Sequence, residues 1–334
     1  MTASEWARQF WIPTPGRGEV RRAPLPPGAP GDVLVRTLYS GISRGTEALV
    51  FRGAVPPSQY ATMRAPFQEG EFPGPVKYGY SSVGTVEEGP DPLRGRTVFC
   101  LFPHQDRYRV PAAAVHPVPD GVPAERAVLA ANMETAVNIV WDAQPAAGDE
   151  ILVIGGGVVG LLAAALCRDV PGARVTVVDP NRSRAATADA LGLRHRTEPA
   201  ATATADLVIH ASGRAEGLRA ALGAAGVEAT IVDASWYGSS EVALPLGEAF
   251  HARRLTIRSS QVGRVPPGRA PRWNTARRLA LALDLLADAR LDVLLTGESP
   301  LEELPAVLAG LAAEPGDALC HRIRYGSRIG QGPR

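Results

Sequence analysis

The sequence predicts an α/β protein of two domains, in which an irregular β-rich domain is interrupted by a domain built on a doubly wound parallel sheet. Its 334 residues exceed what a single hydrophobic core usually holds. Residues 1 to about 120 are rich in Pro and Gly and carry short β-branched runs, which is typical of an irregular β unit. From Ala124 the chain becomes Ala-rich with helical periodicity, and strands and helices then alternate. Such alternation predicts a parallel sheet covered by helices on both faces.

The expected strands follow from the runs of apolar and β-branched side chains. In the β-rich part we expect strands within residues 32–38, 82–87 and 96–102. Four further strands are expected in the α/β part, each followed by a helical segment or a loop. These are residues 150–154, 174–178, 206–210 and 229–233.

The order of elements changes again near residue 255. Residues 255–263 are expected to form a strand, and residues 264–271 form a loop rich in Pro and Arg. Two amphipathic helices at 275–289 and 301–313 and a closing strand at 319–325 complete the chain.

These changes of pattern set the predicted domain boundaries. We expect residues 1–135 and 258–325 to form one domain, with residues 136–257 inserted as the second. The last residues, 326–334, lack apolar anchors and are expected to be a flexible tail.

Composition and charge narrow the classes of partner. The chain has 35 Lys and Arg against 34 Asp and Glu, a formal net charge of +1, so we expect neither nucleic acid nor a membrane surface as partner. A small-molecule substrate fits this balance better. The N-terminal residues show no basic and apolar signal pattern. Three widely spaced cysteines, Cys100, Cys167 and Cys320, offer no disulfide framework, so a reducing cytoplasm is expected.

A glycine-rich turn carries the cofactor signal. The strand at 150–154 runs directly into Gly155-Gly156-Gly157-Val158-Val159-Gly160, a G-x-G-x-x-G pattern that opens a helix. In this context the glycines allow a tight turn, a close approach of the backbone to a pyrophosphate, and packing of helix on strand. The helix N-terminus offers free N–H groups to the phosphates. The sequence therefore predicts a Rossmann dinucleotide site, with a glycine-rich turn that binds no ligand as the alternative.

Asp179 ends the next strand, about 20 residues beyond the turn, where a carboxylate that binds the ribose 2′-hydroxyl is expected. A carboxylate there repels a 2′-phosphate, so we expect NAD(H) to be preferred over NADP(H), although Arg182 and Arg184 follow closely. The predicted cofactor-binding residues are Gly155, Gly157, Val158, Val159, Gly160, Asp179, Arg184, Ser212 and Arg44.

Two segments of the β-rich part are similar to motifs of a known protein family. Residues 41–47 (GISRGTE) are similar to a GIC-(R/G)-(S/T)-D segment, and residues 79–86 (GYSSVGTV) to a GHE-x-x-G-x-V segment. With the order of domains, these segments resemble the medium-chain dehydrogenase/reductase superfamily over nearly the whole chain. The resemblance implies a GroES-like β domain with an inserted Rossmann domain. Within the superfamily, the segment SGISRGTE followed by a GYxSVG block is similar, as a partial match, to the bacteriochlorophyllide a dehydrogenases.

The chain departs from the superfamily at the catalytic metal. Ser43 stands where the family has a zinc-binding Cys, Tyr80 where it has His, and Ser81 where it has Glu. A neutral hydroxyl is a poor substitute for thiolate, imidazole or carboxylate as a zinc ligand. Only Glu134 occupies another ligand position, and the cysteine cluster of the structural zinc loop is missing. We therefore expect a zinc-less protein.

Without zinc, the proton of an alcohol needs another acceptor. We expect Tyr80 to transfer it with help from Lys77, the single lysine, whose ammonium would lower the pKa of the phenol. In an extended segment residues 77 and 80 point to opposite faces, so contact requires a turn at Gly79. Glu134 is the alternative relay or an ion-pair partner of Lys77, and Thr46 is a further candidate.

The predicted substrate contacts are Ser43, Tyr78 and Trp236, with residues 51–76 lining or covering the pocket. The six histidines lack metal-binding spacing and are expected to be structural or surface residues. The predicted function is interconversion of an alcohol and a carbonyl on a small to medium amphipathic substrate. Alternatives are a zinc-independent enoyl or quinone reductase and a nucleotide-binding protein without turnover. The resemblance also implies a homodimer or a dimer of dimers, with residues 241–246 as the candidate edge.

Overall fold

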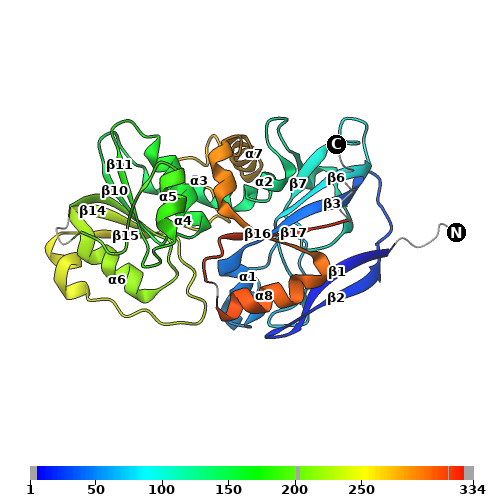
Figure 1. Ribbon diagram of the computed structural model, residues 1–334, viewed down its shortest axis with the longest axis horizontal. Coiled ribbons are helices and arrows are strands. Elements are labelled where there is room, and N and C mark those ends of the chain that lie inside the picture. The colour runs from blue at the N-terminus through cyan, green and yellow to red at the C-terminus, as the bar shows by residue number, and fades with distance from the viewer. Residues whose placement is uncertain (1–5, 201–203, 315, 327–334) are drawn as a thin grey trace. The chain divides into compact units, whose positions relative to one another are not determined.

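The computed structural model describes residues 6–200, 204–314 and 316–326 (Figure 1). The chain divides into two compact units: unit 1 is Met1–Leu129 with Leu295–Arg334, and unit 2 is Ala130–Leu294. The two units differ in architecture, since one is built on antiparallel sheets and the other on a parallel sheet. The predicted α/β fold class, a GroES-like β domain with an inserted Rossmann domain, is thereby confirmed.

Unit 1 contains two sheets. The larger one has the strand order β16-β17-β3-β6-β7-β9, with β8 also paired to β3. Its strands are β16 (Leu295–Pro300), β17 (Cys320–Arg324), β3 (Asp32–Ile42), β6 (Ser82–Glu88), β7 (Thr97–Cys100), β9 (Val115–Pro117) and β8 (Arg107–Pro111). The smaller sheet has the order β2-β1-β5-β4, made of β2 (Arg17–Pro24), β1 (Trp6–Thr14), β5 (Val76–Lys77) and β4 (Glu69–Gly70).

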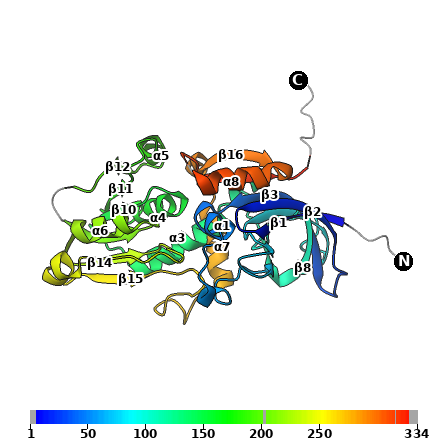
Figure 2. The same cartoon turned by 90° about the horizontal axis from the view of Figure 1, so that it is seen from below.

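Helices and a buried core complete unit 1. Its α-helices are α1 (Arg44–Phe51), α2 (Ala124–Ala127) and α8 (Leu304–Ala313), and α8 packs against α1 and β2 (Figure 2). Short 3-10 turns lie at 57–59, 112–114 and 301–303. One core cluster of the larger sheet contains Val33, Val35, Val86 and Val98, which lie on β3, β6 and β7.

Unit 2 is a six-stranded parallel sheet in the order β12-β11-β10-β13-β14-β15. The strands are β10 (Glu150–Ile154), β11 (Arg174–Val178), β12 (Arg194–Arg196), β13 (Ala205–His210), β14 (Ala225–Asp233) and β15 (Thr256–Ser259). The helices are α3 (Ala130–Ala143), α4 (Val158–Arg168), α5 (Arg184–Ala190), α6 (Ala215–Ala224) and α7 (Thr275–Leu285). A π-helical turn at 246–250 and a 3-10 stretch at 289–294 complete it. This is the doubly wound arrangement that the alternating pattern predicts.

The second domain boundary lies further along the chain than the sequence suggests. Residues 258–294, which we expected in the β-rich domain, belong to unit 2, because β15 is the sixth strand of its sheet and α7 packs against α3. The expected edge at 241–246 contains no strand, so that interpretation is wrong and β15 ends the sheet. Of the predicted tail, only Gly326 is among the described residues. No helix in the described part of the chain is long and apolar enough to cross a membrane.

Candidate functional site

Tyr80 lies just before β6 in unit 1, and its partly buried ring faces two other hydroxyl groups. The phenol is hydrogen-bonded to the side chains of Ser43 and Thr46. Burial raises the pKa of Tyr80 to about 12, and the charge of Glu47 acts in the same direction, while the hydrogen bonds from Ser43 and Thr46 oppose it. At neutral pH Tyr80 is therefore a protonated phenol, suited to donate a proton to a developing alkoxide.

The start of α1 explains why the Ser43 hydroxyl reaches Tyr80. Ser43 is the N-cap residue, yet its side chain makes no capping hydrogen bond. The cap is supplied by Glu47, whose Oε1 accepts from the Ser43 backbone N–H at 2.8 Å. Ser43 and Thr46 thus present their hydroxyls beside Tyr80, and the charge of the buried Glu47 carboxylate also acts on the phenol.

Behind Glu47 lies a buried chain of hydrogen bonds that sequence reasoning missed. Glu47 Oε2 is 2.8 Å from His104 Nε2, and His104 Nδ1 is 2.6 Å from Ser40 Oγ. Ser40 Oγ is in turn 2.9 Å from the hydroxyl of Tyr325. The sequence analysis expected the histidines to be structural or surface residues and assigned no role to His104. Its partners Glu47 and Ser40 lie far from it in sequence, so no local pattern could identify them.

Lys77 is not arranged as predicted. Its ammonium is 1% exposed and donates to Glu69 and, at 2.8 Å, to Gln105 Oε1. It also lies 5.3 Å from the centroid of the Phe102 ring. Burial lowers the pKa of Lys77, an effect that Glu69 opposes. The expectation that Lys77 lowers the pKa of Tyr80 is wrong, because Lys77 is paired with Glu69 and Gln105 and is not among the groups that shift the pKa of the phenol.

Glu134 lies on α3 in unit 2, where its Oε1 accepts from Nε of Arg278 at 3.1 Å. Arg278, on α7, is 1% exposed and also donates to Asn138 and to the backbone carbonyl of Val262. Burial raises the pKa of Glu134, and Arg278 opposes that rise. The suggested ion pair with Lys77 is therefore wrong, since the carboxylate is paired within unit 2.

The residues at the family's zinc-ligand positions do not fit a zinc ion. The Ser81 hydroxyl donates to the backbone carbonyl of Val128, and the Tyr80 hydroxyl is engaged by Ser43 and Thr46. Among the residues that the structure describes, no group of three or more His, Cys, Asp or Glu side chains is arranged to hold a metal ion. A set of neutral hydroxyls lacks the anionic or imidazole donors that zinc prefers.

A row of aromatic rings connects Tyr80 with the segment 51–76. The ring centroids of Tyr80 and Tyr78 are 6.0 Å apart in an edge-to-face arrangement, those of Tyr78 and Phe72 are 5.7 Å apart, and those of Phe72 and Tyr60 are 5.6 Å apart. Phe72 and Tyr78 are buried. Tyr78, a predicted substrate contact, is therefore a packing residue behind Tyr80.

In unit 2, β10 leads into the glycine-rich turn and then into α4. Gly155 has φ +111°, and a side chain there would approach the backbone of Ala211 and Ser212 to 2.7 Å. A Cβ on Gly160 would lie 1.9 Å from the carbonyl oxygen of Gly155, so only glycine fits. Gly157 is the N-cap residue of α4, followed by Val158 and Val159 in its first turn. The turn thus has the geometry that a dinucleotide pyrophosphate requires.

Asp179 lies directly beside this turn. Its Oδ2 accepts from the backbone N–H of Gly156 at 2.7 Å, and its Oδ1 accepts from that of Asn181 at 2.9 Å. The carboxylate is partly exposed, and each oxygen keeps a lone pair for a further donor such as a ribose hydroxyl. A pocket of about 340 Å³ is lined by residues 196–199 at the end of β12, and the Asp179 backbone N–H donates to the Arg196 carbonyl. Arg184 is buried.

A second polar cluster lies at the carboxyl ends of β13 and β14. His210 Nε2 is 2.6 Å from Ser212 Oγ, and His210 Nδ1 is 2.9 Å from Asp233 Oδ1. The hydroxyl of Tyr237 donates to Asp233 Oδ2 at 2.9 Å, beside the partly exposed Trp236. Parallel sheets bind ligands at the carboxyl ends of their strands. Ser212 and Trp236 follow β13 and β14 at these ends, which is a suitable place for contact with a ligand. Arg44, in unit 1, donates to the Ala318 carbonyl at 2.9 Å.

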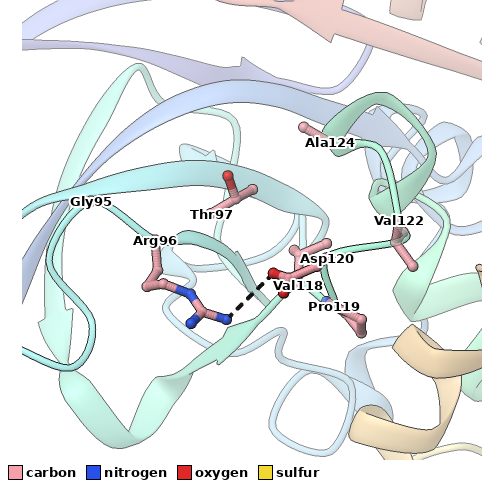
Figure 3. A pocket seen from close by; sticks show the side chains of 8 residues that line it. All are labelled: Gly95, Arg96, Thr97, Val118, Pro119, Asp120, Val122 and Ala124. Atoms are coloured by element: carbon pink, nitrogen blue, oxygen red, sulfur yellow. Dashed lines mark ion pairs between the residues drawn. The ribbon is translucent and has the colours of Figure 1, made fainter.

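A further pocket in unit 1, of about 310 Å³, is separate from all the predicted site residues. Figure 3 shows that the Arg96 and Asp120 side chains approach each other across it, 3.9 Å apart. It is lined by Gly95, Arg96, Thr97, Val118, Pro119, Asp120, Val122 and Ala124. Asp120 is fully exposed and Arg96 half exposed, so this ion pair contributes little to the stability of the fold.

The fold and the glycine-rich turn define a class of protein. A GroES-like β unit, interrupted by a parallel-sheet unit with a dinucleotide-binding turn, is the architecture of the medium-chain dehydrogenase/reductase superfamily. The chain has the fold of solved dehydrogenases of this architecture, such as galactitol-1-phosphate dehydrogenase from Escherichia coli. This fold agrees with the resemblance to the superfamily inferred from the sequence motifs. The closer likeness to bacteriochlorophyllide dehydrogenases stays a prediction.

Comparisons with known proteins agree with this class. The family described as "Alanine dehydrogenase/PNT, C-terminal domain" matches residues 130–231. The chain is 27% identical over 224 residues to a 2-dehydro-3-deoxy-L-galactonate 5-dehydrogenase of Pseudoalteromonas atlantica, an alignment that covers 63% of this chain and 62% of that relative. The match therefore spans less than two thirds of the curated relative.

Solved structures show the same fold over nearly the whole chain. L-Idonate 5-dehydrogenase from Escherichia coli superposes with a TM-score of 0.78 at 14% identity, covering 96% of this chain and 99% of that one. An alcohol dehydrogenase from E. coli in complex with NADH has a TM-score of 0.75 at 18% identity, covering 96% of this chain and all of that one.

Proposed function

We propose that the protein is a zinc-independent, NAD(H)-dependent oxidoreductase that interconverts an alcohol and a carbonyl on a small to medium amphipathic substrate. The observation that carries this proposal is the Tyr80 hydroxyl, bonded to Ser43 and Thr46 at the position where the superfamily has a zinc-binding histidine. The curated relative and the two solved neighbours are named dehydrogenases, which supports the class of reaction.

The cofactor half of the proposal rests on unit 2. The N–H groups at the start of α4 would bind the pyrophosphate, and Asp179 would accept from the ribose hydroxyls. A bound nicotinamide would supply the acceptor or donor of hydride. NAD(H) is favoured over NADP(H) because the Asp179 carboxylate repels a 2′-phosphate. Ser212 and Arg44 remain proposed cofactor contacts.

Proton chemistry is assigned to unit 1. In carbonyl reduction Tyr80 donates its proton to the developing alkoxide, and Ser43 and Thr46 hold the phenol in place. These hydroxyl donors take over the role of charge stabilisation that a Lewis acid has in zinc enzymes. The zinc independence is supported by the engagement of Ser81 with Val128 and by the neutral donors around Tyr80.

Assembly and location complete the proposal. β15 is the terminal strand of the parallel sheet, and pairing of two such edges in a homodimer, or in a dimer of dimers, would cover it. The three cysteines are free and buried, which favours a reducing cytoplasm.

The test is a panel of alcohols and carbonyls, including 2,3-butanediol, L-threonine, L-idonate and cyclic secondary alcohols. Each is followed by nicotinamide absorbance with NAD(H) or NADP(H), before and after chelation. We expect turnover that survives chelation and falls by about 10²–10⁴ in Tyr80→Phe, with NADH affinity retained. Stoichiometric zinc, or full activity of Tyr80→Phe, would contradict the proposal. NADH binding without any turnover would point to a nucleotide-binding protein.

A further inference from the structure

A buried histidine joins two neighbouring strands of unit 2 at their carboxyl ends. His210 ends β13 and is fully buried, and Asp233 ends β14 with a side chain that is 12% exposed. His210 Nδ1 is 2.9 Å from Asp233 Oδ1, and His210 Nε2 is 2.6 Å from Ser212 Oγ. Both ring nitrogens are therefore engaged, one by a carboxylate and the other by the hydroxyl of a partly exposed serine.

The surroundings of Asp233 keep its carboxyl group ionised. Its Oδ1 also accepts from the Ser235 backbone N–H at 2.9 Å, and its Oδ2 accepts from the Tyr237 hydroxyl at 2.9 Å. Burial alone would raise the pKa of Asp233, but these hydrogen bonds and the one from His210 outweigh burial and lower it. An ionised carboxylate can only accept, so the His210 nitrogen that faces it carries a proton.

This proton fixes the direction of the next hydrogen bond. With Nδ1 protonated, the neutral ring of His210 has a bare Nε2, which accepts the proton of the Ser212 hydroxyl. Ser212 Oγ itself accepts from the Arg214 backbone N–H at 3.2 Å. A hydroxyl group has one proton and two lone pairs. Ser212 therefore keeps one lone pair that no residue in the described part of the chain fills.

Close packing holds Ser212 between α6 and the glycine-rich turn. A Cβ on Gly217, in the first turn of α6, would lie 2.2 Å from Ser212 Oγ and 2.6 Å from His210 Nε2, so only glycine fits there. On the other element, a Cβ on Gly155 would lie 2.7 Å from the backbone nitrogen of Ser212. Ser212 thus borders the turn that has the geometry for a dinucleotide pyrophosphate.

The order of the strands indicates which half of a dinucleotide Ser212 faces. β10, which leads into the turn, lies between β11 and β13. Asp179, the proposed partner of the adenosine ribose, follows β11, whereas Ser212 follows β13 on the other side of the turn. A dinucleotide that binds across these strand ends has its nicotinamide riboside on the Ser212 side.

From this we infer that Ser212 is a hydrogen-bond acceptor for the nicotinamide riboside half of the cofactor, and that His210 and Asp233 are positioning residues that keep it an acceptor. The inference rests on the proposed function. The group that Ser212 recognises is a hydrogen-bond donor, which the riboside offers at its ribose hydroxyls and at its carboxamide N–H. A His210 cation would reverse the assignment, because both ring nitrogens would then donate and Ser212 would turn its own proton outward.

The first test needs neither substrate nor cofactor. In protein labelled with ¹⁵N-histidine, the His210 signals are assigned by their loss in His210→Phe, with the exposed His251→Phe as the matched control in the same unit. Ser212→Ala, which should shift the Nε2 signal, gives a second assignment if His210→Phe does not fold. We expect a neutral ring with its proton on Nδ1 at neutral pH. A ring protonated on Nε2, alone or together with Nδ1, would overturn the inference.

The second test measures binding by isothermal titration calorimetry, without turnover. The ligands are NAD⁺, 3-acetylpyridine adenine dinucleotide, whose ketone lacks the N–H donor, and analogues whose nicotinamide ribose lacks the 2′- or the 3′-hydroxyl. We expect one of these analogues to bind the wild type about 3–10-fold more weakly than NAD⁺, as for the loss of one hydrogen bond. In Ser212→Ala this difference should disappear. The analogue that shows it identifies the donor as the carboxamide or a ribose hydroxyl.

A pair of glycine variants tests the positioning by His210. Gly217→Ala should push Ser212 away from His210 and remove the preference for NAD⁺ over the same analogue. Gly223→Ala, on the same helix but with open space around its Cβ, is the matched control and should keep the preference.

Two binding results would overturn the inference. They are equal binding of NAD⁺ and every analogue to the wild type, and a full wild-type preference in Ser212→Ala that is shown to be folded by circular dichroism. If NAD⁺ binds but these differences fail, the proposed function stands without this contact. If the wild type binds neither NAD⁺ nor NADH, the proposed function itself fails, whereas the tautomer of His210 is still decided by the first test.

Discussion

Arg278 and Glu134 form a buried ion pair, with 3.1 Å between Nε and Oε1, that joins α7 to α3 within unit 2. The guanidinium also holds Asn138 and the Val262 carbonyl, so it ties a long loop to both helices. Glu134 stands at a position where the resembled family places a metal ligand. In this chain its carboxylate is instead part of a structural ion pair.

Removal of Arg278 should destabilise unit 2 strongly. Arg278→Met leaves the Glu134 carboxylate buried without its cation, which costs about 3–5 kcal/mol in the free energy of unfolding. Urea denaturation followed by circular dichroism measures this loss. Arg254→Met is the matched control, because its pair with Glu228 is exposed and is expected to contribute less than about 1 kcal/mol. Equal losses in the two variants would contradict the assignment.

Lys77 and Glu69 form an asymmetric pair, since the ammonium is buried and the carboxylate is half exposed. Lys77→Met should be tolerated, because it replaces a buried cation with an apolar chain and leaves Glu69 solvated. Glu69→Gln leaves the buried ammonium without an anion, and we expect a loss on the order of 1–3 kcal/mol. Thermal unfolding of both variants measures the difference. A hundredfold loss of turnover in a stable Lys77→Met would instead show that the lysine takes part in catalysis.

Asp179 should decide the choice of cofactor. Asp179→Gly removes the charge that opposes a 2′-phosphate and also the acceptor for the N–H groups of Gly156 and Asn181. We expect weaker NAD(H) binding and a smaller preference over NADP(H), measured by isothermal titration calorimetry. Asp206→Gly, at the opposite end of the sheet, serves as the control because its carboxylate accepts from the Glu150 N–H. A wild type that prefers NADP(H) would refute the role of Asp179.

Alkaline pH should destabilise the fold through its buried tyrosines. Burial raises the pKa of Tyr80 from 10.0 to about 12, so folding favours its protonated form. That contribution is complete below pH 10 and is lost as the pH rises towards 12. The free energy of unfolding, measured in urea at a series of pH values, should therefore fall above pH 10. Tyr80→Phe should reduce the slope by up to about 1.4 kcal/mol per pH unit, and identical slopes would argue against this shift.

The dinucleotide turn could be predicted because all its determinants are local. The strand before Gly155, the helix after Gly160 and the carboxylate of Asp179 fall within one strand, helix and strand unit, and steric demands fix the residue types. The two-domain α/β fold class could be predicted for the same reason, since hydrophobic periodicity reports directly on which faces are buried.

The buried hydrogen bonds around His104 could not be predicted in the same way. His104 is 57 residues from Glu47 and 64 from Ser40, and Ser40 is 285 residues from Tyr325. No spacing rule connects such residues, because their proximity is a product of sheet pairing. The partner of Lys77 could not be predicted for a related reason. Strand β4 pairs with β5 and brings Glu69 opposite Lys77, whereas the sequence suggested Tyr80 or Glu134 as the partner.

The row of rings from Tyr60 through Phe72 and Tyr78 to Tyr80 has a consequence for protein engineering. Segment 51–76 is the natural place to graft a new loop from a relative in order to change specificity. Because Phe72 packs on Tyr78, and Tyr78 on Tyr80, a graft that alters Phe72 would shift the support of Tyr80, the proposed proton donor. Under the proposed function, substrate range and catalytic rate would be linked through this packing, so a graft should keep Phe72 and Tyr78 and vary only the exposed residues of the loop.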